Sequence, residues 1–242
     1  MYSSLTVSDI VNRDYGTADV FTKWGINYCC GGNITLTKVC EQQNIDQAAV
    51  EAELKEATKK INVRGNPAYN EWPIDFLVDY VIYVHHAYVR KVGPQLNEQL
   101  KQVAEAHKAK HPELELVQDF FQDLIDELLE HMQSEEDRIF PYIKQINNTY
   151  NRKEVYGKLF VRTLRKPLTD VVEKEHSRIT ATLIQLRKIT NDFTISPDTC
   201  PKVQVIYRKL QEFDRDLVQH KHLENNILVP RAVAMEKELL HL

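Results

Sequence analysis

Four long stretches of the chain repeat apolar residues every three or four positions, the spacing that gives a helix one buried face. Glu, Lys, Gln and other strong helix formers are common at the polar positions between them. We therefore expect four long helices, with Pro94 bending the first and Pro141 ending or bending the second. Their expected ranges are 74–107, 113–145, 167–190 and 202–228.

The front of the chain follows a different pattern, in which short apolar stretches are separated by turn signals. Thr17, Thr35 and Asp46 are placed to cap short helices, and Gly25 is placed to end the first of them. A segment rich in Gly, Pro and Asn follows, as in a linker. We expect an all-α protein made of a small helical domain, a linker and a four-helix bundle. These parts are residues 1–62, 63–73 and 74–242.

Each long helix carries one histidine on its apolar face, and in the second and fourth helices a glutamate follows four residues later. Residues four apart lie on the same side of a helix, so each such pair can reach one point in the core. The first histidine precedes the second by almost the same distance as the third precedes the fourth, which indicates two similar helical hairpins. The six residues are His86, His131, Glu135, His176, His220 and Glu224.

Taken singly, each of these six residues has an ordinary explanation. A histidine on an apolar face is more often a satisfied core residue, and a His-x3-Glu pair is more often a solvated surface pair. Two buried carboxylates without cations, however, would cost several kcal/mol each. A site for two metal ions, with terminal imidazoles and bridging carboxylates, removes that cost. Mixed ligands of this kind suit iron, manganese or zinc, and affinity order alone does not choose among them.

Two more carboxylates lie within reach of this site. Glu127 stands one turn before His131, and Glu175 adjoins His176. We expect both near the metal, as extra bridges or as hydrogen-bond acceptors around the ligands, with an exposed helix residue as the alternative for Glu175. His85 is expected outside the ligand set, either behind the ligands or at the surface.

Cys29 and Cys30 stand together just before Gly31-Gly32. One interpretation is that they are small, partly buried apolar residues. The other is a reactive pair, because the glycines leave the backbone accessible and adjacent thiols do not easily form a relaxed disulfide with each other. Such thiols could exchange with a partner thiol, accept a nitrosyl group or receive iron. On that interpretation they are the candidate catalytic residues.

Composition narrows the function classes. The formal net charge of −4 gives no basic surface for nucleic acid. The start, Met1 to Thr6, lacks the features of a signal peptide, and no run approaches the roughly 18 apolar residues of a membrane helix. The four cysteines show neither zinc spacing nor a disulfide framework. We expect a cytoplasmic protein that binds neither nucleic acid nor membrane.

The histidine and glutamate pattern resembles the hemerythrin-like family. Besides the six residues above, the resemblance rests on the runs His86-Ala87-Tyr88-Val89-Arg90, Glu175-His176 and Glu224-Asn225-Asn226. The front segment, from Asp9-Ile10-Val11-Asn12 to Cys29-Cys30-Gly31-Gly32, resembles the small cysteine-bearing N-terminal domain of the Repair of Iron Centers proteins. The resemblance covers nearly the whole chain.

This resemblance implies a hemerythrin-like bundle that holds two non-haem iron ions, bridged by carboxylates and an oxo group, on the six residues. It implies support for the repair of iron–sulfur clusters damaged by nitric oxide or oxidative stress, through iron donation or nitric oxide handling. The implied partners are damaged iron–sulfur proteins or nitric oxide, and a homodimer stays open. The alternatives are a nitric oxide or peroxide reductase using the same irons and an oxygen-binding hemerythrin. Whether the protein is an enzyme also stays open.

Overall fold

The computed structural model of the 242-residue chain is all-α in the parts that it describes, as predicted. Outside the helices, Thr6 and Thr35 form an isolated antiparallel bridge. For Asn12, 169–171 and 173–175 only the backbone is described. None of the described helices combines the length and the apolarity needed to cross a membrane. The described residues are 2, 4–14, 17–28, 34–58, 68–154, 156–162, 168–196 and 199–241.

The chain divides into two compact units. The first contains Met1–Asn66 together with Phe193–Lys209, and the second contains Pro67–Asp192 together with Leu210–Leu242. The segment 193–209, which the sequence assigned to the bundle, belongs to the first unit because its Val205 lies in the same apolar core as the front helices.

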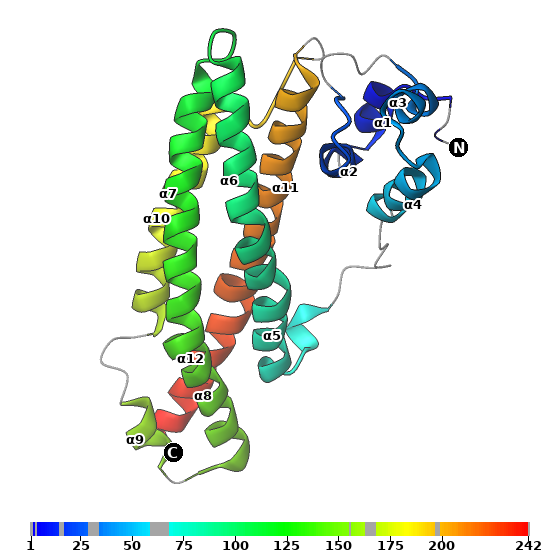
Figure 1. The fold of residues 1–242 in the computed structure, drawn as a ribbon. Helices are drawn as coiled ribbons and strands as arrows, with labels where there is room; N and C mark the ends of the chain where they lie inside the picture. Colours follow the sequence, from blue (N-terminus) through cyan, green and yellow to red (C-terminus); the bar gives the residue numbers. More distant parts are fainter. Residues whose placement is uncertain are drawn as a thin grey trace. The chain divides into compact units, whose positions relative to one another are not determined.

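Four short helices build the front of the first unit (Figure 1). The Asp46 carboxylate caps the last of them by accepting from the backbone N–H groups of Ala48 and Ala49, as predicted. Gly25 follows the second helix with φ +67°, a left-handed conformation that glycine adopts without steric cost. The helices are α1 (Val7–Arg13), α2 (Thr17–Lys23), α3 (Leu36–Gln43) and α4 (Gln47–Ala57).

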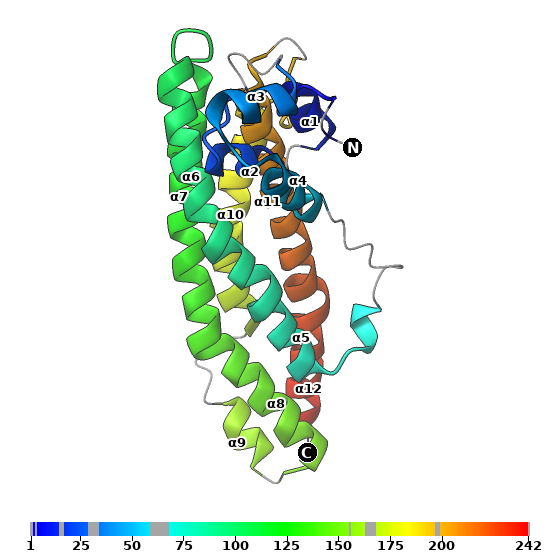
Figure 2. The ribbon, with the colours of Figure 1, turned by 45° about the vertical axis from the view of Figure 1, so that its right-hand side comes forward.

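The second unit contains the long helices, several of which are interrupted by a π-helical turn. Such a turn joins each backbone N–H to the carbonyl five residues back and often marks a functional site. Figures 1 and 2 show α6, α7 and α10 running side by side, with α11 beside α6. In chain order the elements are α5 (Ile74–Tyr80), the π turn η2 (Val81–His86), α6 (Ala87–His107), α7 (Glu113–Ser134), the π turn η3 (Glu135–Ile139), α8 (Phe140–Arg152), α9 (Gly157–Val161), α10 (Leu168–Ile189), α11 (Pro201–Leu223), the π turn η4 (Glu224–Leu228) and α12 (Val229–His241).

The second and fourth long helices continue beyond their predicted ends at 145 and 228. The reason is the π turn before each proline. The N–H of Phe140 donates to the carbonyl of Glu135, and the N–H of Val229 donates to that of Glu224. This wider turn relieves the clash between a proline ring and the carbonyl four residues back. The helix therefore passes through Pro141, and in the same way through Pro230.

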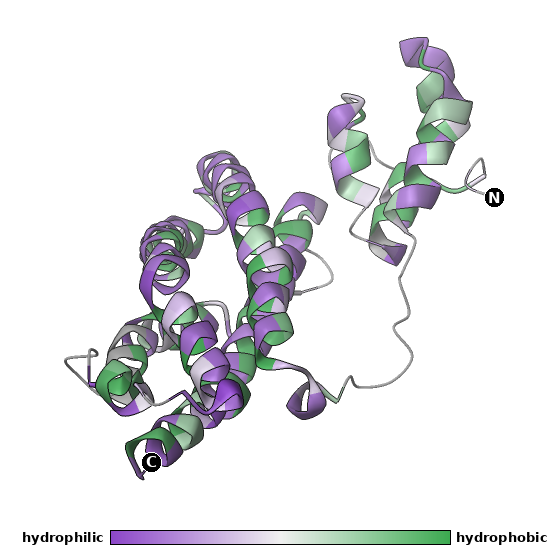
Figure 3. Ribbon diagram, turned by 90° about the horizontal axis from the view of Figure 1, so that it is seen from below, coloured by the Kyte–Doolittle hydropathy of each residue, from purple (hydrophilic) through white to green (hydrophobic). Residues whose placement is uncertain are grey.

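An apolar core surrounds η2, η3 and η4. Apolar and polar residues alternate along the helices, as expected when each buries one face (Figure 3). Burying one Leu or Phe side chain completely contributes about 1.5–3 kcal/mol, so this cluster holds the π turns firmly in place. Its fully or almost fully buried members include Leu77, Val81, Phe140, Ile143, Leu223 and Leu228.

Candidate metal centre

The six predicted ligands are all buried in the second unit, with side chains that are no more than 6% exposed. His86 is the last residue of η2, whereas Glu135 and Glu224 are the first residues of η3 and η4. His131 and His220 stand one turn earlier on α7 and α11, so each His-x3-Glu pair faces one point, as the spacing predicts. Residue His176 of α10 completes the set.

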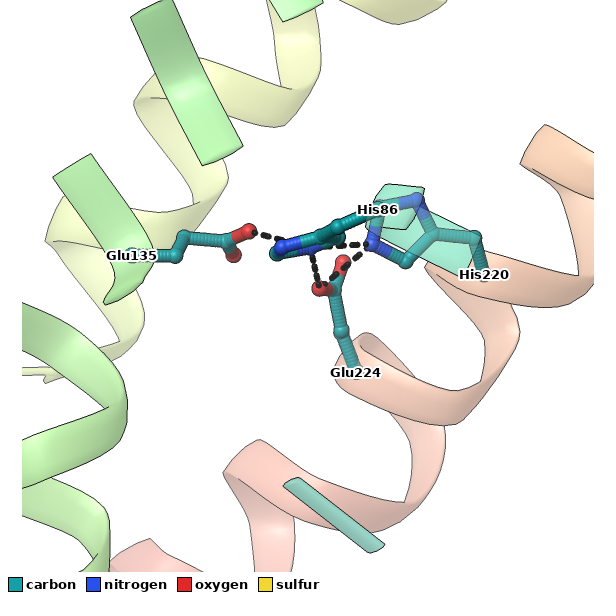
Figure 4. A group of neighbouring side chains, drawn as sticks. All are labelled: His86, Glu135, His220 and Glu224. Carbon is teal, nitrogen blue, oxygen red and sulfur yellow. Dashed lines mark hydrogen bonds and ion pairs between the residues drawn. The ribbon is translucent and has the colours of Figure 1, made fainter. Parts of the chain in front are cut away.

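One half of the centre is formed around the imidazoles of His86 and His220, which we call the His86–His220 half (Figure 4). Their Nε2 atoms lie 3.1 Å apart. The Oε1 atom of Glu224 lies 2.8 Å from Nε2 of His220, and Oε2 of Glu135 lies 3.4 Å from Nε2 of His86. One donor atom from each of the four residues falls within 4.8 Å of the others, a spacing that can hold a metal ion.

The other half is formed around His131 and His176, and we call it the His131–His176 half. Their Nε2 atoms lie 3.0 Å apart. Oε2 of Glu135 lies 3.3 Å from His131, and Oε2 of Glu224 lies 3.3 Å from His176. Both glutamates thus belong to both halves, which is the position of a carboxylate that bridges two cations.

The donor set fits cations better than it fits a closed hydrogen-bond network. Oε2 of Glu135 and Oε2 of Glu224 are buried, and neither has a hydrogen-bond partner among the described residues. A buried oxygen of this kind carries a large desolvation cost unless a cation or a donor meets it. Buried imidazole and carboxylate donors also match the ligand preferences of first-row transition metals.

Hydrogen bonds to residues outside the donor set orient the imidazoles of His86 and His176. Nδ1 of His86 donates to Oε1 of Glu136 at 2.6 Å, and that oxygen also accepts from Arg90 at 2.8 Å. Nδ1 of His176 donates to Oδ1 of Asn225 at 2.7 Å. These bonds keep the proton on Nδ1, so that Nε2, which faces the centre, is the nitrogen that would bind a metal.

The sequence reasoning missed Glu136 and Asn225. Each directly follows a glutamate of the centre and is the second residue of a π turn, η3 or η4. A π turn has more residues per turn than an α-helix, so neighbouring side chains diverge by a smaller angle. The signal for that turn was present in the proline that follows each His-x3-Glu pair, at Pro141 and at Pro230.

His85 lies directly behind the centre. Its side chain is only 2% exposed, its Nδ1 lies 3.0 Å from Oδ1 of Asp216, and its ring is stacked on that of His220 at a centroid distance of 5.5 Å. The alternative that placed His85 at the surface is therefore wrong. His222, by contrast, is exposed.

The charges of the centre compensate one another. Burial alone would lower the pKa of His86 and of His176, but the nearby carboxylates of Glu135 and Glu224 raise these pKa values to about 9 and about 10. Burial would likewise raise the pKa of Glu224, but the neighbouring histidines, His220 foremost, hold it well below its usual range. A cation that binds here must displace protons from the imidazoles.

Glu127 belongs to neither half of the centre. Its Oε1 accepts from Nη2 of Arg178 at 2.9 Å, and it lines a cavity of about 260 Å³ that also borders His131. Glu127 therefore lies beside the centre, and its role as an extra bridge or as a hydrogen-bond acceptor around the ligands stays a prediction. The side chain of Glu175, and both Cys29 and Cys30, lie outside the described residues.

A helical bundle with histidines and glutamates converging in its core defines a hemerythrin-like cation-binding protein. Residues 77–232 match the model of the "Hemerythrin HHE cation binding domain". Residues 3–58 match that of ScdA_N, described as a domain of unknown function (DUF542). The chain belongs to the hemerythrin-domain proteins that carry this second domain in front, the Repair of Iron Centers family.

Several curated proteins are similar to this chain over almost its whole length. "Iron-sulfur cluster repair protein YtfE" of Escherichia coli O157:H7 is 30% identical over 220 residues, which cover 90% of this chain and 91% of that protein. The protein of the same name from Citrobacter koseri gives the same values. "Iron-sulfur cluster repair protein ScdA" of Staphylococcus haemolyticus is 26% identical over 225 residues, which cover 92% and 95% of the two chains.

Proposed function

We propose that this chain is a di-iron protein that supports the repair of iron–sulfur clusters damaged by nitric oxide or oxidative stress. The observation that carries the proposal is the pair of glutamates, Glu135 and Glu224, each shared by two groups of metal-binding donors in a buried core. The names of the relatives, which match along both the front segment and the bundle, favour cluster repair over an oxygen carrier or a nitric oxide or peroxide reductase.

Two kinds of ligand, imidazoles and carboxylates, would hold iron in the centre. His86, His131, His176 and His220 would offer Nε2 as terminal donors, and the two glutamates would offer carboxylate oxygens to both positions. Buried apolar and aromatic neighbours exclude water, which strengthens every charge interaction inside. Iron bound there would supply ferrous–ferric redox chemistry, reactivity toward nitric oxide and a store of transferable iron.

The test is restoration of a damaged iron–sulfur enzyme by the iron-loaded protein. The change His220→Ala removes a donor of the centre, and His222→Ala removes an exposed histidine two residues away as the matched control. We expect wild type and His222→Ala to restore activity and to hold about two irons per chain, and we expect His220→Ala to fail at both. Full restoration by His220→Ala, or zinc in place of iron in protein made with both metals available, would contradict the proposal.

We propose that Cys29 and Cys30 act on the damaged iron–sulfur protein, the client, or on the transferred iron rather than in the metal centre. The support is their place in the sequence, between the predicted stop of a helix and Gly31-Gly32. Changing both to Ala should leave the two irons and their optical spectrum intact while restoration is lost. If both thiols resist alkylation until the protein is denatured, and the double variant restores the client fully, the cysteines have only a packing role.

A further inference from the structure

The two halves of the metal centre differ in the group that orients one imidazole. Glu136 and Asn225 occupy equivalent positions, one residue after the shared glutamates of η3 and η4. Yet His86 donates to a carboxylate at 2.6 Å, whereas His176 donates to a neutral amide oxygen at 2.7 Å. Hydrogen bonds to a charged acceptor are about twice as strong as neutral ones, and a carboxylate partner makes the imidazole a more basic metal ligand.

Arg90 stabilises the charged form of the Glu136 carboxylate. Its Nη1 lies 2.8 Å from the same oxygen of Glu136 that accepts from His86. The guanidinium holds the carboxylate in place and keeps it negatively charged. Asn225 has no charge to hold, so its amide can orient His176 without increasing the basicity of the ring to the same degree.

The surroundings of the two halves also differ, and they cover the His86–His220 half more completely. In the His86–His220 half, the ring of Phe140 stacks on His86 and the ring of His85 stacks on His220, each at 5.5 Å. Nδ1 of His220 has no hydrogen-bond partner among the described residues, so ring packing sets its orientation. Both covering rings are only 2% exposed. This half is covered by buried aromatic rings.

The His131–His176 half instead borders a cavity of about 260 Å³. Its lining includes exposed side chains, so the cavity lies at the surface. It also includes the carboxylates of Glu130 and of Glu127, the second of which is paired with Arg178. The lining residues are Glu127, Glu130, His131, Ser134, Arg138, Arg178 and Ile179.

We infer that the centre holds its two metal ions unequally: the His86–His220 half retains its ion, and the His131–His176 half releases its ion through the cavity beside His131. The inference rests on the proposed function, for which it identifies the iron that is donated. No electron moves in the release step. A ferrous ion leaves as Fe²⁺, and the freed imidazoles take up protons in its place.

The test follows the removal of Fe²⁺ by a coloured chelator under anaerobic conditions. Wild type should lose one equivalent in a fast phase and one in a slow phase, at least about tenfold apart, since partners of metal ligands change affinity by roughly 10–100-fold. Asn225→Asp replaces the amide that orients His176 by a carboxylate and should slow the fast phase about tenfold. Glu136→Gln removes the carboxylate of the other half and should speed the slow phase by a similar factor.

Two ligand variants identify which phase belongs to which half. His131→Ala should leave one equivalent that is removed slowly, and His86→Ala should leave one that is removed quickly. Circular dichroism checks that each variant is folded, and Asn225→Asp, which only adds a charge, keeps the test valid if a ligand variant unfolds. Repeating the experiment with Co²⁺ gives an absorption spectrum for each half. Glu136→Gln should change the spectrum of the His86–His220 half, whereas a purely structural role of Glu136 would leave it unchanged.

Removal of both ions at one rate, or an unchanged fast phase in Asn225→Asp, would overturn the inference. These outcomes are separate from those that test the proposed function. Two-phase release by a protein that restores no cluster would contradict the proposed function and support the unequal binding of the two ions. Restoration of a cluster by a protein that releases both ions at one rate would support the proposed function and contradict the unequal binding.

Discussion

The change Glu224→Gln tests whether one carboxylate serves both metal positions. Glu224 is 1% exposed, its Oε1 faces His220 at 2.8 Å and its Oε2 faces His176 at 3.3 Å. Glutamine keeps the shape of the side chain and removes its charge. We therefore expect both metal positions to weaken together, whereas His131→Ala should weaken mainly the His131–His176 half.

The size of the effect follows from the burial of the charge. Removing one partner of a buried, hydrogen-bonded charge pair costs about 3–5 kcal/mol. At about 1.4 kcal/mol for each factor of ten, this corresponds to roughly two to three and a half orders of magnitude in dissociation constant at each position. A surface carboxylate that was only close to the metals would give a loss of less than about 1 kcal/mol.

The assay is competition between the protein and a chromogenic chelator for Zn²⁺, which has no redox chemistry of its own. Glu105→Gln, a change of an exposed glutamate on α6, serves as the matched control and should bind like wild type. Thermal unfolding gives a second measurement, because a ligand at a thousand times its dissociation constant adds about 4 kcal/mol of stability for each site. Wild-type affinity at either position in Glu224→Gln would refute the reasoning, as would equal weakening of both positions in His131→Ala.

Three further predictions concern residues outside the donor set. Arg187→Ala should lower the free energy of unfolding by about 3 kcal/mol in a denaturant titration, because it leaves the buried carboxylate of Asp214 without the two guanidinium bonds at 2.9 and 3.0 Å; an unchanged midpoint would contradict this. Asp46→Ala should destabilise the first unit by about 1 kcal/mol through loss of the α4 cap, with the metal content unchanged. A loss of metal in this variant would show that the first unit influences the centre. His85→Leu should keep two metals but alter the Co²⁺ spectrum, since leucine can neither stack on His220 in the same way nor bond to Asp216; identical spectra would exclude His85 from the surroundings of the metals.

The donor residues could be predicted from the sequence because a helix converts spacing into direction. His131 and Glu135 are four apart, so their side chains face one point whatever the rest of the fold does. The apolar stripes then place that point in the core. The sequence therefore predicted both the all-α architecture and the convergence of the six side chains.

The groups around the donors could not be found in this way. Glu136 lies next to Glu135 in the chain, and in a regular α-helix it would point about 100° away. Its bond to His86 depends on the π turn η3 and on the packing between two helices, since the two residues are 50 positions apart in the chain. Helix periodicity carries no information of that kind. The pairing of Glu127 with Arg178 was missed for the same reason, since it joins α7 to α10.

The π turns make the centre depend on the number of residues in each helix as well as on their identity. Turning η4 into a regular α-helix while keeping all of its residues would remove the wider turn that accommodates one extra residue. All that follows would then rotate by about 100° relative to His220, so Leu228 and Ala232 would leave the apolar core. The extra residue lets the donors and the core-facing residues of one continuous helix point correctly at the same time. Relatives that have one residue fewer between the His-x3-Glu pair and its proline should therefore have a regular α-helix at that place.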